Sequence, residues 1–338
     1  MRYRDAGVDV SRSDAIKDDV IRAIRSTWNP TVRPVVGGFA GIMAMPGGGS
    51  LVAATMDGVG TKLHLAKEAG RLEDAAADLV FHGADDLLVH GARPFAFLDY
   101  IAQARLEHDT VVAIVTGLSR ACRDVGAVLL GGETAEMPDT YLEGVVDVAG
   151  CMLGHVAPDA VLDGSRVRPG DVLLGLASAG PHTNGYSLAR RVLKVTGTPL
   201  AAPLPGGEGV SVGDALLAPH QWYGPALLGA IELGQVRAMA HVTGGGIAGN
   251  LVRVLPDRCR ASVRASSWPR PAVMRWLIEQ GALPEDDARQ ALNLGIGMVV
   301  VTAASDADAV AAQVERAGIR AWRVGEVSEG PKGVDWVD

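Results

Sequence analysis

The stretch Met56-Asp57-Gly58-Val59-Gly60-Thr61-Lys62 comes directly after a short apolar run at residues 51–55. The apolar run predicts a buried β-strand. The two glycines of the stretch allow the chain to turn sharply at the carboxyl end of that strand, which is the edge where α/β folds bind their ligands. The stretch therefore predicts an α/β fold with a ligand-binding turn at residues 56–62.

The side chains of this turn suit a phosphate that is bound together with magnesium. The Asp57 carboxylate is a metal ligand, while Thr61, Lys62 and backbone N–H groups suit phosphate oxygens. The stretch is not a Walker A loop, because the Gly-x4-Gly-Lys-Ser/Thr spacing is absent. A strand-ending glycine turn with a solvated lysine explains the same residues, so both interpretations stay open at this point.

Length and composition narrow the class of protein. The 338 residues suggest two domains, and a net charge of −8 without a long basic run argues against nucleic acid and anionic membranes as partners. The chain has no uninterrupted apolar segment of 18 residues and its N-terminus is polar, so we expect neither a membrane span nor a signal peptide. Cys122, Cys151 and Cys259 are widely spaced and form no metal motif, which fits reduced cysteines in a cytoplasmic protein.

The first half of the chain alternates between helix and strand patterns. Apolar periodicity predicts helices at about 14–26 and 73–90, and a third that Asp109 caps and Gly126 ends. Strands are expected at 95–102, 127–130 and 145–156. Asp85 and Asp86 lie in mid-helix among apolar residues, where a cation would relieve their repulsion and desolvation. We predict that Asp86 binds metal, although one carboxylate of the pair facing water is the simpler alternative.

Three further segments of the first half are rich in glycine. Residues 35–41 include Gly37 and Gly38, whose backbone could cover phosphates, although a lone glycine cluster is weak support. Residues 46–49 indicate a hairpin or surface loop. Residues 131–138, Gly-Gly-Glu-Thr-Ala-Glu-Met-Pro, follow a predicted strand and resemble a second ligand-facing turn. A helix N-terminus that favours acidic residues is the competing interpretation.

A polar, glycine- and proline-punctuated segment at 163–170 predicts a domain boundary, which gives domains 1–162 and 163–338. A strand at 171–177 then leads into a turn at 178–185 that carries His182 and Asn184, followed by a helix to about 194. Backbone N–H groups at that helix start suit an anionic or amide-rich ligand. His182 capping the turn is the alternative.

A second histidine turn follows the strand predicted at 238–242. It reads His241-Val242-Thr243-Gly244-Gly245-Gly246, and three consecutive glycines carry an entropic cost without packing anything. We therefore expect a ligand site there. The remaining segments are expected to be scaffold, with strands at 260–265, 299–301 and 320–327 and helices at 271–280 and 306–317.

With these motifs laid out, the chain resembles the aminoimidazole ribonucleotide (AIR) synthetase family, the phosphoribosylformylglycinamidine cyclo-ligases of purine biosynthesis, over nearly its whole length. The resemblance rests on the order and spacing of several motifs together. They are Asp5 to Asp9, Asp57 to Lys62, Asp86 to Val89, Phe97 to Tyr100, Gly131 to Pro138, His182 to Leu188, His241 to Gly246 and Gly295 to Met298.

The resemblance implies a two-domain α/β (α+β) subunit whose N-terminal sheet-and-helix domain binds ATP and pairs into a homodimer, with a C-terminal α/β substrate domain. It implies ATP-dependent ring closure of formylglycinamidine ribonucleotide to 5-aminoimidazole ribonucleotide, with release of ADP and phosphate. ATP activates the formyl oxygen as an iminophosphate, and the amidine nitrogen closes the ring. Such chemistry needs mainly positioning and charge neutralisation.

The resemblance also assigns roles to individual residues. ATP and magnesium would be held by Gly37, Gly38, Asp57, Gly58, Thr61, Lys62, Gly131, Gly132 and Glu133, with Asp57 and Asp86 as the metal ligands. The substrate would be bound by His182, Asn184, Gly185, Thr243, Gly244, Gly245 and Gly246. His182, Asn184 and His241 would orient the substrate or move protons, a task suited to histidine near neutral pH.

Several positions depart from the family pattern. Asp85 stands where asparagine is expected, Met56 where threonine or cysteine is expected, His90 where glutamine is usual and Arg93 where glutamate is common. Ile21 occupies the place of a lysine on the first helix. These departures concern the metal shell and the N-terminal phosphate contacts.

Other ATP-using proteins of the same fold are the alternative, as is a nucleotide-binding paralogue without cyclo-ligase activity. Selenophosphate synthetase needs a reactive cysteine near the N-terminus, whereas the first cysteine here is Cys122. The hydrogenase-maturation relative uses a C-terminal cysteine, whereas this chain ends in Asp338. Thiamine-monophosphate kinase lacks motifs of the types at 131–138 and 241–246.

Overall fold

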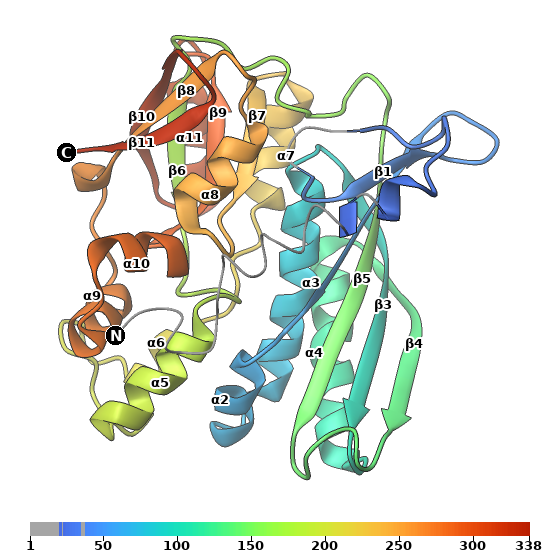
Figure 1. The fold of residues 1–338 in the computed structure, drawn as a ribbon, viewed down its shortest axis with the longest axis vertical. Helices are drawn as coiled ribbons and strands as arrows, with labels where there is room; N and C mark the ends of the chain where they lie inside the picture. The colour runs from blue at the N-terminus through green and yellow to red at the C-terminus, as the bar shows by residue number, and fades with distance from the viewer. Residues whose placement is uncertain (1–19, 22, 35–37) are drawn as a thin grey trace.

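The structure is a computed structural model that describes residues 20–21, 23–34 and 38–338 (Figure 1). The described strands form two sheets. The first has the order β1-β2-β5-β3-β4 and the second the order β11-β8-β10-β6-β9-β7. No helix within the described ranges is both long and apolar enough to cross a membrane.

The first sheet and its helices come from residues 41–156. Their bounds are β1 (Gly41–Ala44), β2 (Leu51–Gly58), α2 (Lys62–Glu68), α3 (Leu72–Leu88), β3 (Arg93–Gln103), α4 (His108–Val125), β4 (Val128–Glu136) and β5 (Val146–Val156). β3 and β4 pair in parallel across α4, and the other neighbouring pairs are antiparallel. α3 and α4 pack on one face of this sheet (Figure 1).

None of the helices labelled in Figure 1 covers the opposite face of the first sheet in the described part of the chain. In β5, buried residues alternate with residues that are half-buried or exposed, as expected for a strand that packs on one side only. Neighbouring strands place Met56, Cys151 and Leu98 in one row, with Leu153 and Val128 beside it. We call these five residues the open sheet face. It is apolar, and Met56 and Val128 are among its exposed members.

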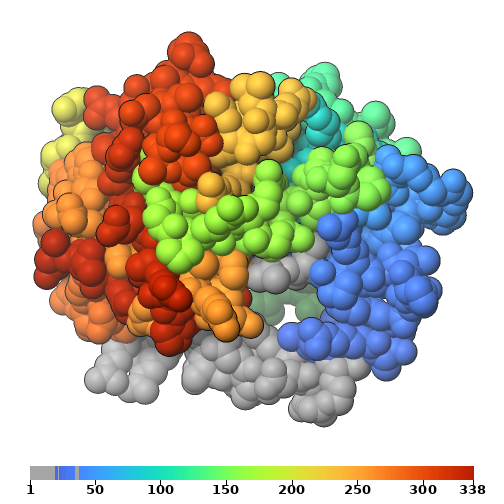
Figure 2. All heavy atoms as spheres, turned by 90° about the horizontal axis from the view of Figure 1, so that it is seen from above, coloured from blue at the N-terminus to red at the C-terminus, as the bar shows by residue number. Residues whose placement is uncertain are grey.

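The second sheet and its helices come from residues 172–337. Their bounds are β6 (Val172–Ala177), α5 (Tyr186–Thr196), α6 (Val212–Leu216), α7 (Gly224–Glu232), β7 (Val236–His241), α8 (Gly246–Leu251), β8 (Cys259–Arg264), α9 (Ala272–Gly281), α10 (Glu285–Ala291), β9 (Ile296–Thr302), α11 (Ala307–Arg316), β10 (Ala321–Glu329) and β11 (Gly333–Val337), with short 3-10 helices at Val252–Val254 and Ala265–Ser267. Every residue of β9 is buried. The segment after β5 runs from the first half to the second over the face seen in Figure 2.

The two halves are joined by hydrogen bonds that end on α3. The backbone N–H of His220 donates to Asp78 at 2.7 Å, and that of Tyr223 donates to Asp85 at 3.1 Å. Both acceptors are fully buried. The second half therefore packs on α3.

Most predicted elements are confirmed, including the strand before Asp57, the helix that carries Asp85 and Asp86, and the helix that ends at Gly126 with its left-handed cap. Two local predictions are wrong. Residues 131–136 continue β4 instead of forming a turn, because they pair with residues 98–103 of β3. The N-cap of α4 is Glu107, and Asp109 lies in its first turn. Of the predicted helix at 14–26, residues 14–19 and 22 lie outside the described residues, and so does the motif at 5–9.

Candidate active site

Four buried histidines meet where α3 faces the second half. His82 comes from α3, His182 from the turn before α5, His220 from the loop before α7 and His241 from the end of β7. Ring centroids are 4.1 Å apart for His182 and His220, 4.8 Å for His82 and His241, and 5.2 Å for His220 and His241. The sequence separates these residues widely, and the packing of the two halves brings them together.

His82 lies between the two carboxylates that were predicted to bind metal. Its Nε2 is 2.8 Å from Oδ2 of Asp57 and 3.8 Å from Oδ2 of Asp86. Burial opposes the ionisation of Asp57, but His82 and the N–H of Gly58 outweigh it, so the pKa of Asp57 lies below its usual value. Burial likewise opposes a charged His82, and the two aspartates outweigh it and raise the pKa of His82. Asp57, His82 and Asp86 thus form one electrostatic unit.

Asp86 also orients His241. Nδ1 of His241 donates to Oδ1 of Asp86 at 2.8 Å. Burial outweighs this hydrogen bond and lowers the pKa of His241, so the imidazole is held neutral at pH 7. Its Nε2 has no hydrogen-bond partner among the described residues. That nitrogen therefore carries a lone pair that can accept a proton or bind a cation.

Asp85 faces away from this unit, toward the loop before α7. Its Oδ1 accepts the Tyr223 N–H, and its Oδ2 lies 3.3 Å from Nε2 of His220. Complete burial raises the pKa of Asp85 well above its usual value, against the effect of the Tyr223 N–H, and the charge of Asp86 adds to the rise. The two adjacent aspartates therefore serve different neighbours.

The turn at 178–185 places His182 and Asn184 beside the Asp57 turn. His182 adopts a left-handed backbone conformation with φ 61°, and its Nε2 accepts the Ala179 N–H at 3.3 Å. Burial lowers the pKa of His182 well below its usual value, and the neighbouring histidines and Lys62 lower it further. The Asn184 carboxamide lies close to Gly244, because a Cβ on that glycine would be 3.6 Å from the Asn184 oxygen.

One pocket of about 250 Å³ joins the two turns. It is lined by residues 57–61 of the first turn, residues 183–187 of the second and His82. Gly58 and Thr61 lie on its wall, and the Thr61 hydroxyl contacts the Ser187 hydroxyl at 3.2 Å. Gly185 starts α5 with φ 81°, a conformation that favours glycine. The pocket is open on the side of Asp57, whose side chain is 46% exposed.

Lys62 does not occupy the position expected for a phosphate ligand. Its side chain is 1% exposed, and its ammonium contacts a carboxylate oxygen of Asp78, the carbonyl oxygen of His182 at 2.8 Å and that of Ala218 at 3.5 Å. Burial opposes the charge, but the attraction of Asp78 outweighs it and raises the pKa of Lys62. All three donors of the ammonium are directed to protein oxygens.

The remaining predicted residues lie at different distances from this centre. Thr243 to Gly246 connect β7 to α8, next to His241 and Asn184. Gly131, Gly132 and Glu133 lie on the edge strand β4 and are exposed. Glu133 is paired through Tyr100 and Ala149 to Gly58, so about 14 Å of sheet separates it from the Asp57 turn. Gly38 accepts a hydrogen bond from Arg253 at 2.9 Å, and Gly37 lies outside the described residues.

Sequence reasoning missed His82 and His220. His82 precedes Asp86 by four residues on a predicted helix, a spacing that puts both on one face. That spacing could have revealed His82. His220 lies in the sequence Ala218-Pro219-His220 without a motif, and only the packing of its loop against α3 brings it into the site.

Comparisons with known proteins agree with this architecture. The family model described as "AIR synthase related protein, N-terminal domain" matches residues 37–156, and the corresponding C-terminal domain model matches residues 168–338. The phosphoribosylformylglycinamidine cyclo-ligase of Xanthomonas campestris pv. campestris (strain 8004) is 42% identical over 332 residues, which cover 97% of this chain and 96% of that protein.

Among solved structures, thiamine-monophosphate kinase from Stenotrophomonas maltophilia K279a has a TM-score of 0.65 at 23% identity, covering 94% of each chain. T. maritima PurL complexed with AMPPCP has a TM-score of 0.58 at 18% identity, covering 89% of this chain and 44% of that one. At these identities the likeness concerns the fold. Matched along nearly its whole length by curated relatives and by both domain models, this chain belongs to the phosphoribosylformylglycinamidine cyclo-ligase family of AIR synthase related proteins.

Proposed function

We propose that this chain closes the imidazole ring of formylglycinamidine ribonucleotide at the expense of ATP, and releases 5-aminoimidazole ribonucleotide, ADP and phosphate in purine biosynthesis. The observation that carries the proposal is the shared pocket, in which the acidic Asp57 turn faces residues 183–187 of the second half. A phosphoryl donor and its acceptor must lie side by side, because most of the rate enhancement in such transfers comes from positioning and charge neutralisation.

Asp57 and Asp86 would hold magnesium. Their carboxylates and His82 offer ligand atoms that all lie within 4.8 Å of one another, and the exposure of Asp57 leaves room for phosphate oxygens and water, which magnesium prefers as ligands. Two carboxylates therefore fit the ion. When bound, magnesium would neutralise charge on the transferred phosphoryl group. Thr61 and the N–H groups of the Asp57 turn would contact the nucleotide phosphates.

The second half would supply the groups that act on the amidine substrate. Neutral His241, fixed by Asp86 through Nδ1, presents Nε2 as a proton acceptor. His182 is also held neutral, and Asn184 supplies an amide that can donate to and accept from the substrate. Gly185 and the stretch from Thr243 to Gly246 would let the ribose phosphate approach the backbone closely. In this assignment Asp86 connects the metal to the base.

We assign residues 1–162 to an ATP-binding and dimerisation domain and residues 163–338 to a substrate domain of a cytoplasmic enzyme. The open sheet face supports a homodimer, because the exposed Met56 and Val128 adjoin three half-buried apolar residues on it, and contiguous exposed apolar surface marks an interaction site. Val128→Arg should convert the dimer to a monomer in sedimentation velocity. Leu233→Arg, at an exposed apolar residue on the second half, should leave it unchanged. A monomeric wild-type protein, or a dimeric Val128→Arg protein, would contradict this assignment.

The enzymatic proposal is tested by incubating the protein with ATP, magnesium and formylglycinamidine ribonucleotide and measuring the aminoimidazole product and ADP. We expect stoichiometric formation of both, dependent on magnesium. Thiamine monophosphate in place of the ribonucleotide should give no ADP above background. Nucleotide binding without product would identify a nucleotide-binding paralogue and overturn the proposal.

A further inference from the structure

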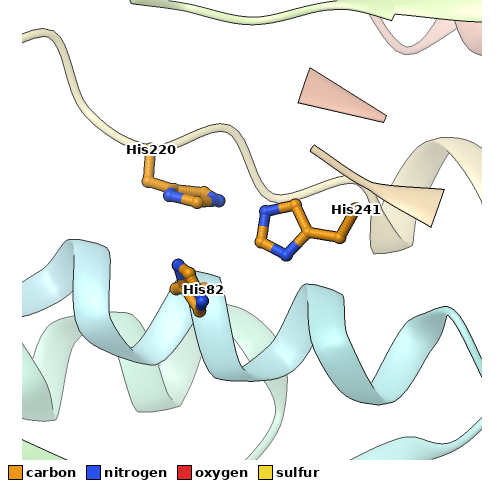
Figure 3. A group of neighbouring side chains, drawn as sticks. All are labelled: His82, His220 and His241. Atoms are coloured by element: carbon orange, nitrogen blue, oxygen red, sulfur yellow. The ribbon is translucent and has the colours of Figure 1, made fainter. Parts of the chain in front are cut away.

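Three of the buried histidines present ring nitrogens to one another. His82, His220 and His241 each offer one nitrogen such that all three nitrogens lie within 4.8 Å of one another. Figure 3 shows the three rings around a common space, with a nitrogen of His241 directed toward His220 and a nitrogen of His82 on the side of His220. We propose that, in the absence of nucleotide and substrate, these three histidines bind a divalent transition-metal cation of the zinc class, a state in which Nε2 of His241 is a metal ligand and not the proton acceptor of the catalytic state.

The spacing suits such an ion. For three atoms at most 4.8 Å apart, a cation at their centre lies within about 2.8 Å of each. Zinc binds imidazole nitrogens at about 2.0–2.1 Å. Each ring would therefore move by less than about 1 Å to complete the site, which is within the reach of side-chain rotation. Three protein ligands would leave a fourth tetrahedral position for water.

Each imidazole has a carboxylate beside it. Asp57 lies 2.8 Å from Nε2 of His82, Asp86 lies 2.8 Å from Nδ1 of His241, and Asp85 lies 3.3 Å from Nε2 of His220. Metal-binding histidines generally direct their second nitrogen to such a partner, which fixes the ring and raises its basicity. Asp57 and Asp86 would thus support His82 and His241, and Asp85 lies beside His220. Zinc on the other nitrogen of His82 would replace its contact with the Thr183 hydroxyl, which lies 2.6 Å from Nδ1.

A purely structural role leaves several nitrogens unexplained. Neither ring nitrogen of His220 has a hydrogen-bond partner among the described residues, and the same holds for Nε2 of His241. Both side chains are fully buried, and a buried polar group without a partner is destabilising. Asp85 is buried as well, with one oxygen unpartnered in the described structure. A cation bound to one nitrogen of His220 would satisfy that nitrogen, leave the other free to face Asp85, and favour the ionised form of the Asp85 carboxyl.

The donor set distinguishes this ion from magnesium. Magnesium prefers oxygen ligands, whereas imidazoles favour zinc and its neighbours in the first transition row. The two sets share His82, and of their other members only Asp57 is exposed, whereas Asp86, His220 and His241 are buried. The histidine site would also bind the two halves of the chain to one another, since His82 belongs to the first half and the other two to the second.

The test measures zinc uptake by the full chain in the absence of nucleotide. Protein freed of metal with a chelator, then of the chelator, is titrated with Zn²⁺ against a chromophoric zinc indicator, and zinc is counted after gel filtration. We expect one Zn²⁺ per chain. Co²⁺ in its place should give the visible absorption bands of a four-coordinate site with nitrogen ligands.

Two variants and a control locate the ion. His220→Asn should lower zinc affinity by roughly 100-fold or more, and Asp85→Asn by about 10- to 100-fold because it only positions His220. His90→Gln is the matched control, since His90 is equally buried but hydrogen bonds to Leu162 outside the site, and it should bind zinc like the wild type. If His220→Asn does not fold by circular dichroism, Asp85→Asn and the wild-type stoichiometry decide. No zinc on the wild type, or equal retention by all folded variants, overturns the proposal.

Discussion

Asp57 and His241 occupy corresponding places in the two halves, each at or near the end of a strand and ahead of a glycine-containing turn. Asp57 is 46% exposed, whereas His241 is completely buried. The difference arises because the end of β2 borders an open pocket, while the end of β7 packs against α3 through Asp86. The same local device therefore serves two purposes. An open carboxylate suits charged ligands from solvent, and an enclosed imidazole suits one proton transfer in a fixed geometry.

Replacing His241 should distinguish proton transfer from nucleotide binding most clearly. His241→Ala should lower turnover by about 100- to 10,000-fold, the range for general acid–base or orienting groups, with ATP affinity nearly unchanged. Turnover, nucleotide affinity and melting temperature are measured on one sample that has been treated with chelator and returned to magnesium. Near-normal turnover, or a loss of ATP affinity equal to the loss of rate, would remove the distinction between the two turns.

A substitution at Lys62 tests whether this residue stabilises the buried interface or binds phosphate. Lys62→Met leaves Asp78 buried without its cation, which should destabilise the fold by about 3–5 kcal/mol. Chemical denaturation measures this loss. A stable Lys62→Met protein with weakened nucleotide binding would instead restore the phosphate-binding role predicted from the sequence. Lys67→Met is a suitable control, because Lys67 forms a partly exposed ion pair with Glu107.

The carboxylates of the open side should affect the nucleotide. Asp57→Asn and Asp86→Asn should each weaken magnesium-dependent ATP binding by roughly 10- to 100-fold while the protein stays folded, since each loses one charged ligand. Calorimetric titration with and without magnesium gives the comparison. Unchanged titrations in both variants would mean that the metal binds elsewhere.

The smallest effect is expected at Asp85. Asparagine at this position can still accept the Tyr223 N–H and can donate to His220, so Asp85→Asn should keep turnover in magnesium buffer within about tenfold of the wild type. Asp85→Ala leaves that N–H unpaired and should lose about 1–3 kcal/mol of stability. A complete loss of activity in Asp85→Asn would show that Asp85 and Asp86 exchange roles.

Elements with strong periodicity could be predicted from the sequence because their pattern is local. The apolar run before Asp57, the stripe of α4 and the left-handed Gly126 cap are such cases. The turn predicted at Gly131 is wrong because glycines favour a turn locally, whereas pairing with β3 keeps these residues in β4. Within the site, the carboxylates and the two histidine turns were recognised by their motifs. His220 was not, since its place depends on contacts with Asp78, 142 residues away along the chain.

The burial of Lys62 could not be predicted for the same reason. Its partner Asp78 lies on a different helix, and its other two acceptors, the carbonyl oxygens of His182 and Ala218, belong to the second half. A glycine turn with a lysine at its end is compatible with an exposed or a buried side chain. Only the assembled interface between the two halves selects the buried one.

The packing of the second half on α3 should make the two halves unfold together. Asp78 and Asp85 are both desolvated, and each accepts a backbone N–H from the loop that precedes α7. Separating the two halves would expose both acceptors and the Lys62–Asp78 ion pair at once. An unfolding intermediate with only one half folded would therefore be unstable. Heating should therefore give a single cooperative transition in which calorimetric and van't Hoff enthalpies agree, although the chain contains two separate sheets.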